Sequence, residues 1–170
     1  MKKALGTAVN DIVKTYDAEQ SEFRDDVSLT VSVDNIAAVS EKLKMTHKFE
    51  VLSSHTAVDY YPSLAPRFHM VYQFTSVSKK IRLEVRVPLE GNDPIAPSIH
   101  KIYPNADWFE RELWDMFGIK FESHPDLRRI LMPHDWEGHP LRKDYPLGYE
   151  EVQFSFNYEE IEKRKPKPKD

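Results

Sequence analysis

Cysteine is absent from all 170 residues of the chain. Its absence excludes disulfides, zinc–thiolate sites, ordinary iron–sulfur ligation and a thiol nucleophile. We therefore expect any redox chemistry near this protein to be carried by groups bound to other chains.

Glycine is scarce as well, with only five residues, and none of them lies in a GxGxxG or GxxxxGK pattern. Loops with those patterns cradle the phosphates of nucleotides, so direct binding of a nicotinamide or flavin cofactor is disfavoured. The GxSxG elbow that positions a nucleophilic serine is also missing. The sequence thus predicts no cofactor in this chain.

Long apolar runs and an excess of positive charge are missing too. No segment approaches the roughly 20 apolar residues of a membrane span. The start of the chain reaches Asn10, Asp11 and Lys14 too soon for a signal peptide. The net charge of −4 offers no attraction to nucleic acid or to an anionic membrane surface. We expect a soluble, cytoplasmic protein that only its partners hold at a membrane.

Hydrophobic residues make up 40% of the chain, which is enough for one sizeable core. Apolar spacing of three and four residues predicts helices over 4–16 and 36–45. Alternation of apolar and polar residues predicts four strands, at 27–33, 49–58, 68–74 and 81–87. The last two strands are expected to form an antiparallel hairpin. Together these elements indicate an α+β domain over 1–118, with a mainly antiparallel sheet covered by helices on one face.

A further helix is predicted over 108–117. Asp107 is placed as its cap, and Glu110 follows at the spacing of a capping box. Gly118 is suited to a left-handed helix end, which glycine adopts without steric cost.

The charged residues of this helix allow two interpretations. Arg111 and Asp115 stand at ion-pair spacing, with Glu110 and Glu112 on either side of the arginine. They form either a solvated face or a contact surface. Residues two apart on a helix point in different directions, so Glu110 and Glu112 do not form a general acid–base pair.

The segment after Gly118 is interrupted by regularly spaced prolines, which exclude a long helix or a central strand: Pro125, Pro133, Pro140 and Pro146. It nevertheless carries more apolar and aromatic residues than a solvated loop exposes. We interpret 119–161 as an extended arm that docks along another chain. The alternative is that the arm wraps its own domain. Residues 162–170 alternate lysine and proline and are predicted to be a mobile tail.

A metal site is the alternative chemical interpretation of the arm. Histidine and carboxylate side chains of the kind that bind metals lie close together in the sequence: His124, His134, His139, Asp126, Asp135 and Asp144. This set would make the protein a stand-alone metal-dependent enzyme. No two of the histidines have the i, i+4 helical spacing, and the two His-Pro pairs are equally well explained by turn geometry.

Three stretches carry a resemblance to a known family. They read ERELWDMFGI at 110–119, HPDLRRIL at 124–131 and DWEGHPLRKDYP at 135–146, with a looser match over 68–87. In residue types and spacing the chain resembles the C-type, or 30 kDa, subunit family of complex I, the NADH:quinone oxidoreductase. The resemblance covers about half of the chain strongly and is weak before Val58.

The resemblance implies a non-catalytic subunit of the peripheral arm, at the cytoplasmic side of the inner membrane. It implies packing against the D-type, or 49 kDa, subunit that lines the quinone pocket, and neighbouring iron–sulfur subunits. FMN, iron–sulfur clusters and quinone are then expected in the partners of an enzyme that couples electron transfer from NADH to quinone with proton translocation. An equivalent subunit of a membrane-bound hydrogenase or of a ferredoxin- or deazaflavin-dependent oxidoreductase remains an alternative.

The candidate partner interface combines the charged helix with the arm. Guanidinium groups make bidentate pairs with carboxylates, so the arm is predicted to hold a charge network that fixes register at the interface. Trp136 is predicted to be an anchor of docking. The candidate interface residues are Glu110, Arg111, Glu112, Asp115, His124, Asp126, Arg128, Arg129, Asp135, Trp136, Arg142, Asp144 and Tyr145.

Overall fold

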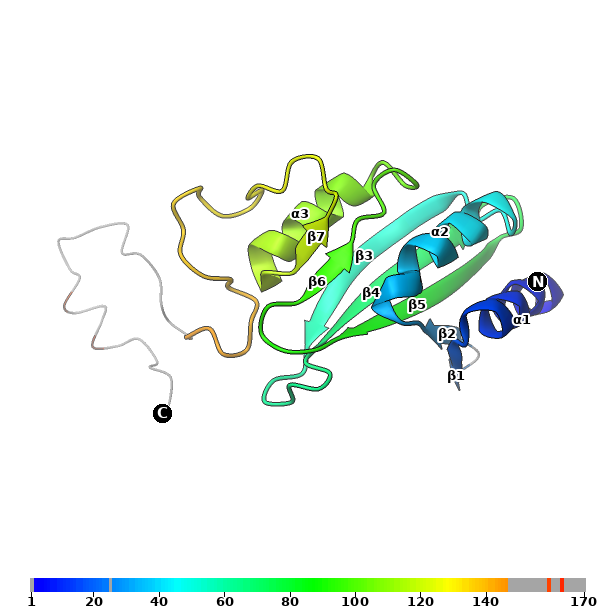
Figure 1. Ribbon diagram of the computed structural model, residues 1–170, viewed down its shortest axis with the longest axis horizontal. Coiled ribbons are helices and arrows are strands. Elements are labelled where there is room, and N and C mark those ends of the chain that lie inside the picture. Colours follow the sequence, from blue (N-terminus) through cyan, green and yellow to red (C-terminus); the bar gives the residue numbers. More distant parts are fainter. Residues whose placement is uncertain (1, 25, 147–158, 160–162, 164–170) are drawn as a thin grey trace.

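The computed structural model describes residues 2–24, 26–146, 159 and 163 (Figure 1). Its elements, in chain order, are α1 (Lys2–Tyr16), β1 (Glu19–Phe23), β2 (Asp26–Thr30), a 3₁₀ turn (Val33–Asn35), α2 (Ile36–Met45), β3 (Val51–Asp59), β4 (Phe68–Ser76), β5 (Ile81–Leu89), β6 (Ile95–Pro97), α3 (Ala106–Phe117) and β7 (Lys120–Glu122). Most of the predicted arm beyond residue 146, and nearly all of the predicted tail, lie outside the described residues.

The strands form a five-stranded sheet in the order β1-β2-β5-β4-β3, and β6 and β7 form a separate parallel pair. Within the larger sheet only the β2–β5 pair is parallel. The predicted hairpin is confirmed, because β4 and β5 pair antiparallel with Tyr72 opposite Val85. The α+β class with a mainly antiparallel sheet is therefore confirmed.

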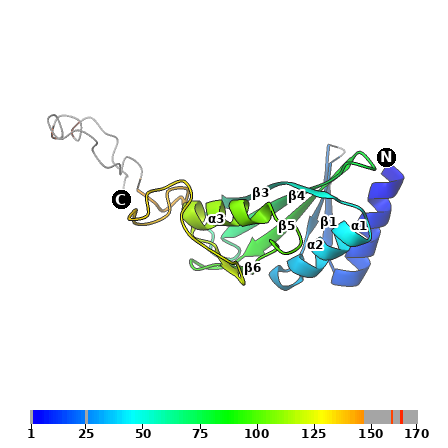
Figure 2. The same cartoon turned by 90° about the horizontal axis from the view of Figure 1, so that it is seen from above.

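One face of the sheet carries the core. Alternate side chains of β4 and β5 are buried and pack in a single cluster with apolar residues of all three helices, such as Ile12, Leu43 and Leu113. Figures 1 and 2 show α2 and α3 side by side over the same face of the sheet. They also place α3 and the arm at one end of an elongated molecule, and α1 and β1 at the other.

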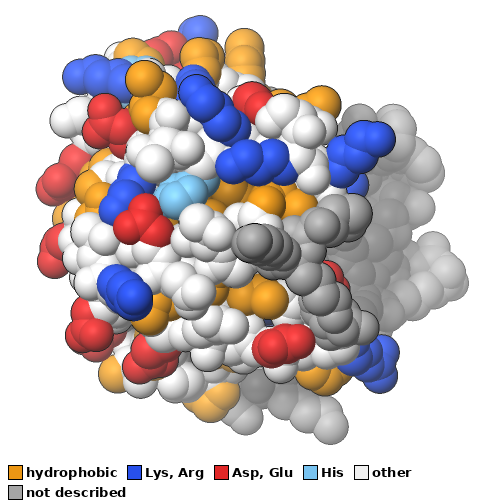
Figure 3. All heavy atoms as spheres, turned by 90° about the vertical axis from the view of Figure 1, so that its right-hand side faces the viewer, with side chains coloured by type: hydrophobic (Ala, Val, Ile, Leu, Met, Phe, Trp, Pro, Cys, Tyr) orange, Lys and Arg blue, Asp and Glu red, His pale blue; other side chains and the backbone are white. Residues whose placement is uncertain are grey.

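The end of the molecule that carries α1 is shown in Figure 3. Acidic and basic side chains lie interspersed there with hydrophobic ones, without a continuous basic field among the described residues. One mixed cluster is built around Asp11, which bonds to Lys42 at 2.8 Å and to His47 at 2.7 Å. Among the described residues, moreover, every helix is too short or too polar to cross a bilayer.

Three local expectations differ from the structure. α3 begins at Ala106 after Asn105, whose side chain makes no capping bond, so the predicted Asp107 cap is wrong. The strand β1 was not predicted, because its sequence EQSEF is polar and all five residues are exposed. Ile119 and Phe121 are buried in the core and β7 pairs with β6, so the domain extends to Glu122, beyond the predicted division after Gly118.

Candidate functional site

Asp115 is the centre of the junction between α3 and the arm. Its side chain is buried, and its Oδ2 accepts backbone N–H bonds from Ile130 (3.0 Å), Leu131 (2.8 Å) and Met132 (2.9 Å). Its Oδ1 accepts a bond from Nη1 of Arg129 at 2.6 Å. Burial alone would raise the pKa of Asp115, but these donors hold that pKa below its ordinary value. One buried carboxylate thus fixes three consecutive residues of the arm.

Arg129 extends the same junction along the arm. While Nη1 pairs with Asp115, Nη2 donates to the carbonyl oxygens of Trp136 at 2.6 Å and Gly138 at 3.1 Å. The guanidinium also lies over the ring of Trp114, 5.6 Å from its centroid. A planar group with five donors can serve several acceptors at once, which explains why arginine occupies this position. Two separate turns of the arm are tied to one helix through this side chain.

Arg111 does not pair with Asp115 as its spacing predicted. Its Nε and Nη2 donate instead to the carbonyl oxygens of Arg128 and Arg129, both at 3.2 Å. Its guanidinium lies 5.2 Å from the ring centroid of Trp108. α3 therefore contacts the arm through the Asp115 carboxylate and the Arg111 guanidinium, and both groups form hydrogen bonds with the backbone of the arm.

The last carbonyl groups of α3 are also satisfied by the arm. Such groups lack partners within a helix and favour nearby positive charge. The carbonyl oxygen of Asp115 lies 3.0 Å from Nδ1 of His139, that of Met116 accepts the Leu141 N–H at 3.0 Å, and that of Phe117 accepts Nε of Arg142. The arm therefore acts as the C-cap of the helix.

Gly118 makes this close approach possible. It has the predicted left-handed conformation, with φ of 73°. A Cβ at this position would lie 2.6 Å from the ring of His139 and 2.7 Å from Nη2 of Arg142. Glycine is therefore required both by the backbone and by the space that the arm occupies.

A second tie joins the arm to the sheet through Arg67. This arginine is fully buried and pairs with Asp59, with Nε–Oδ1 and Nη2–Oδ2 distances of 3.1 and 3.0 Å. Its Nη2 also reaches Oδ1 of Asp144 in the arm at 2.7 Å, and Asp59 accepts the backbone N–H of Lys143 at 2.9 Å. Hydrogen bonds from Arg67 lower the pKa of Asp144, while those received by Asp59 outweigh the burial that would raise its pKa. Sequence reasoning identified Asp144 but missed both Arg67 and Asp59.

Glu110 and His124 lie near the start of α3, in a polar cluster of their own. Glu110 is fully buried and accepts bonds from Ser98 Oγ and from the Ile99 N–H at 2.8 Å, instead of completing a capping box. Burial raises its pKa to about 7, against the lowering effect of those bonds. His124 Nδ1 accepts the Asp126 N–H at 3.1 Å, which leaves Nε2 to donate to Asp107 at 3.0 Å.

The remaining candidate residues differ in their exposure. Arg128 and Asp126 pair at 2.8 Å with side chains 71% and 58% exposed, so within this chain the pair is a surface pair. Glu112 and Asp135 are exposed. Trp136 and Tyr145 are partly buried, and the Tyr145 hydroxyl lies 3.5 Å from the carbonyl oxygen of Glu137.

The structure thus brings most of the candidate residues together, but as contacts within the chain. Over residues 123–146 the arm wraps its own domain, which was the alternative interpretation. Docking of its outer side along another chain stays a prediction. Within the described ranges, the histidines and carboxylates do not form a group of three or more that could hold a metal.

A groove lies between α3 and the arm, on the outer side of the junction. Its volume is about 370 Å³. The lining combines an indole, two aliphatic side chains and three basic ones: Trp114, Leu127, Met132, Arg128, Arg129 and His134. Elsewhere on α3 and on the arm, the large apolar side chains of Trp108 and Leu141 are more than half exposed. A groove of this composition is typical of a protein contact.

Comparison with known proteins identifies the family. The family model described as respiratory-chain NADH dehydrogenase, 30 kDa subunit, matches residues 29–151. The chain belongs to this family. It is 52% identical over 129 residues to the C-type subunit of the NADH-quinone oxidoreductase of Trichlorobacter lovleyi, and the match covers 76% of this chain and 80% of the relative.

Other members differ in length. The corresponding protein of Roseiflexus sp. (strain RS-1) is 45% identical over 148 residues, covering 86% of this chain and 84% of the relative. That of Salinispora arenicola is 50% identical over 155 residues, but the match covers 89% of this chain and only 59% of the relative. This chain therefore corresponds to a little over half of the longer family members.

Two solved structures share the fold. The trypsin-resistant fragment of Nqo5 is 26% identical, with a TM-score of 0.65 over 73% of this chain and 99% of that fragment. A chain of the membrane-bound sulfane sulfur reductase, an archaeal respiratory membrane complex, is 23% identical, with a TM-score of 0.73 over 95% of this chain and 91% of that one. The second likeness concerns the fold alone. This chain thus has the fold of subunits found in respiratory complexes.

Proposed function

We propose that this 30 kDa-family chain is a non-catalytic scaffold subunit in the quinone-reducing module of an NADH:quinone oxidoreductase. In this role it holds its partners in place, while the complex couples electron transfer from NADH to quinone with proton translocation. The observation that carries the proposal is the junction between α3 and the arm. The buried charged groups of this junction bond to the arm and fix its shape. The outer side of the arm exposes apolar side chains that a partner can contact.

The junction supports a scaffold role through preorganisation. An arm without regular secondary structure would lose conformational entropy on binding, and this loss weakens association. Asp115, Arg129 and Arg67 hold the arm in one conformation before any partner arrives. The partner then meets a rigid surface that includes the groove beside Trp114 and the exposed side chain of Leu131.

We assign the cofactors of the reaction to the partners. The proposed neighbours are the D-type, 49 kDa subunit that lines the quinone pocket and the adjacent iron–sulfur subunits. FMN is proposed to be bound by another subunit of the complex. This chain contributes no cysteine ligand for a cluster. Its attachment to the cytoplasmic side of the membrane is proposed to occur only through the complex.

Affinity purification tests this proposal. The chain, tagged at its amino end, is isolated from detergent-solubilised membranes, and the proteins that accompany it are identified by mass spectrometry. We expect the D-type subunit and iron–sulfur subunits in equal amounts with the chain. Recovery of the chain alone would contradict the proposal, and a nickel-binding large subunit in place of NADH-oxidising partners would assign it to a hydrogenase.

A matched pair of variants locates the docking surface. Leu131 and Val77 have similar exposure, 62% and 63%, but Leu131 lies in the arm and Val77 in the β4–β5 turn. Leu131→Glu is expected to reduce recovery of the partners at least tenfold, because it places a charge in an apolar contact. Val77→Glu is expected to leave recovery unchanged. Equal recovery with both variants would place the docking surface elsewhere.

A further inference from the structure

β1 forms an open edge of the five-stranded sheet. In the strand order it pairs with β2 alone, and all five of its residues are exposed. The opposite edge strand, β3, packs against α3. An open edge presents backbone N–H and C=O groups to any extended chain, and proteins commonly block it with lysine, proline or a bulge. The sequence EQSEF of β1 contains neither lysine nor proline, and its register with β2 is continuous.

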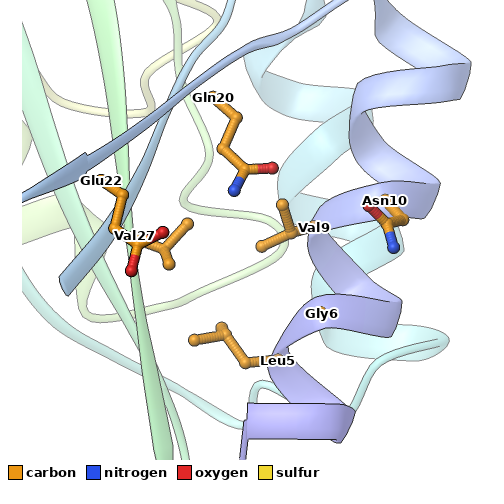
Figure 4. Close-up of a pocket in the computed structure, with 7 residues that line it drawn as sticks. All are labelled: Leu5, Gly6, Val9, Asn10, Gln20, Glu22 and Val27. Atoms are coloured by element: carbon orange, nitrogen blue, oxygen red, sulfur yellow. The ribbon is translucent and has the colours of Figure 1, made fainter. Parts of the chain in front are cut away.

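A pocket of about 190 Å³ lies directly beside this edge. Leu5 and Val9 project from α1 toward β1, and Val27 of β2 completes an apolar floor (Figure 4). Gln20 and Glu22 line the pocket from β1. A Cβ placed on Gly6, in the wall of the pocket, would meet nothing within 4 Å, which confirms that the space is open.

The polar side chains that β1 contributes to the pocket have no partners in the part of the chain that the structure describes. Across the described ranges, the side chains of Gln20 and Glu22 are in no hydrogen bond or ion pair, and the same holds for Glu19 at the start of the strand. The cation next to the strand, Arg24, lies over the ring of Phe23 at 5.1 Å. The pocket therefore carries one carboxylate, that of Glu22, which has no counter-charge among the described residues and lies beside an apolar floor.

We propose that β1 accepts an extended basic segment of a partner subunit as an additional strand, with a lysine side chain seated in the pocket between α1 and β1. Such a side chain matches both parts of the pocket. Its methylene groups pack on Leu5, Val9 and Val27, while its cationic head reaches Glu22. Backbone hydrogen bonds along the edge supply affinity, and the pocket supplies specificity, as in other cases of strand addition.

The opposite side of β1 further defines the occupant. Side chains alternate along a strand, so Phe23 faces away from the pocket, and it is 70% exposed. An occupant with basic residues on one side and apolar residues on the other would fill the pocket and cover Phe23. A second copy of β1 does not supply this occupant, because the sequence EQSEF contains neither lysine nor arginine to pair with Glu22.

The inference concerns a surface outside the family match, since residues 29–151 exclude α1 and β1. It rests on the proposed function only in taking the partner to be another subunit of the complex. It adds a second contact at the end of the molecule opposite the arm (Figures 1 and 2).

Hydrogen exchange and cross-linking in the purified complex test this inference. Exchange of the β1 amides is compared between the complex and the isolated full chain, and a carbodiimide then joins carboxylates to lysines that contact them. We expect the β1 amides to exchange at least tenfold more slowly in the complex, and Glu22 to be joined to a lysine of one partner subunit. Glu22→Lys is expected to abolish that cross-link and at least half of the protection, while Glu90→Lys, an exposed change of equal charge, leaves both unchanged.

Three results would overturn the inference. β1 amides that exchange equally fast in an intact complex would show that the edge is open, and would leave the proposed function untouched. Cross-links from Glu22 to a second copy, or to lysines of the same chain, would replace the partner by another occupant. A chain recovered without any partner would instead refute the proposed function together with this inference.

Discussion

Replacing Asp115 by alanine removes the group on which the junction depends. The carboxylate is buried and serves three backbone N–H groups and Arg129, whose side chain is itself only 12% exposed. Breaking a buried pair by removing one partner costs on the order of 3–5 kcal/mol, because the other charge stays buried. At about 2–4 °C per kcal/mol for a chain of this size, the melting temperature should fall by roughly 6–20 °C.

The stability that Asp115→Ala loses depends on pH in a definite direction. The pKa of Asp115 in the folded protein is lowered from 3.8, because its hydrogen bonds outweigh the burial that would raise it. Its stabilisation is therefore fully present above pH 3.8 and is lost as the pH falls through the folded pKa. The difference between the wild type and Asp115→Ala should be constant near neutral pH and shrink in acid.

Calorimetry and limited proteolysis measure the two consequences. In Asp115→Ala, trypsin should cleave after Arg128 and Arg129 in the folded protein, since the arm is released before the domain melts. The control is Asp126→Ala, which breaks an exposed pair and should cost under about 1 kcal/mol. If both variants melt alike and resist trypsin alike, Asp115 does not hold the arm and the reasoning fails.

Three other perturbations test separate parts of the structure. Burial raises the pKa of Glu110 from 4.5 to about 7, so stability should fall by up to about 1.4 kcal/mol per pH unit as the pH rises through that window. Urea titrations at several pH values measure the free energy of unfolding. Its decrease with rising pH should be lost in Glu110→Gln and kept in Glu112→Gln. Gly118→Ala should cost at least about 1 kcal/mol more than Gly91→Ala in urea unfolding, because both have positive φ but only Gly118 faces His139. His55→Phe should not lower the melting temperature measured by circular dichroism, since both ring nitrogens of this buried histidine lack hydrogen bonds; a clear drop would refute this.

Elements with strong periodicity were predicted well from the sequence. α2 has the predicted bounds, 36–45, and the β4–β5 hairpin pairs as expected. In both cases apolar residues recur at the period of the element, because one face is buried. β1 lacks such a pattern, since neither of its faces enters the core, and it was missed for that reason.

The site was predicted in composition but not in its contacts. Asp115 and Arg129 are fourteen residues apart, and Arg67 and Asp144 are separated by 77. No local spacing rule links such pairs, so sequence reasoning joined Asp115 to Arg111 and left out Arg67 altogether. Charged side chains can pair within the chain or with a partner. Which of the two they do depends on how the arm folds back, and only the three-dimensional structure shows this.

The claim that this chain is a scaffold and not a catalyst is tested most directly by turnover per assembled complex. In membranes that carry Asp115→Ala or Leu131→Glu, the amount of intact complex and the rate of NADH-dependent quinone reduction are measured together. The account predicts that the rate falls in proportion to the amount of complex, so that turnover per complex stays equal to that of the wild type. A normal amount of complex with lost turnover would contradict it and place these residues in the reaction itself.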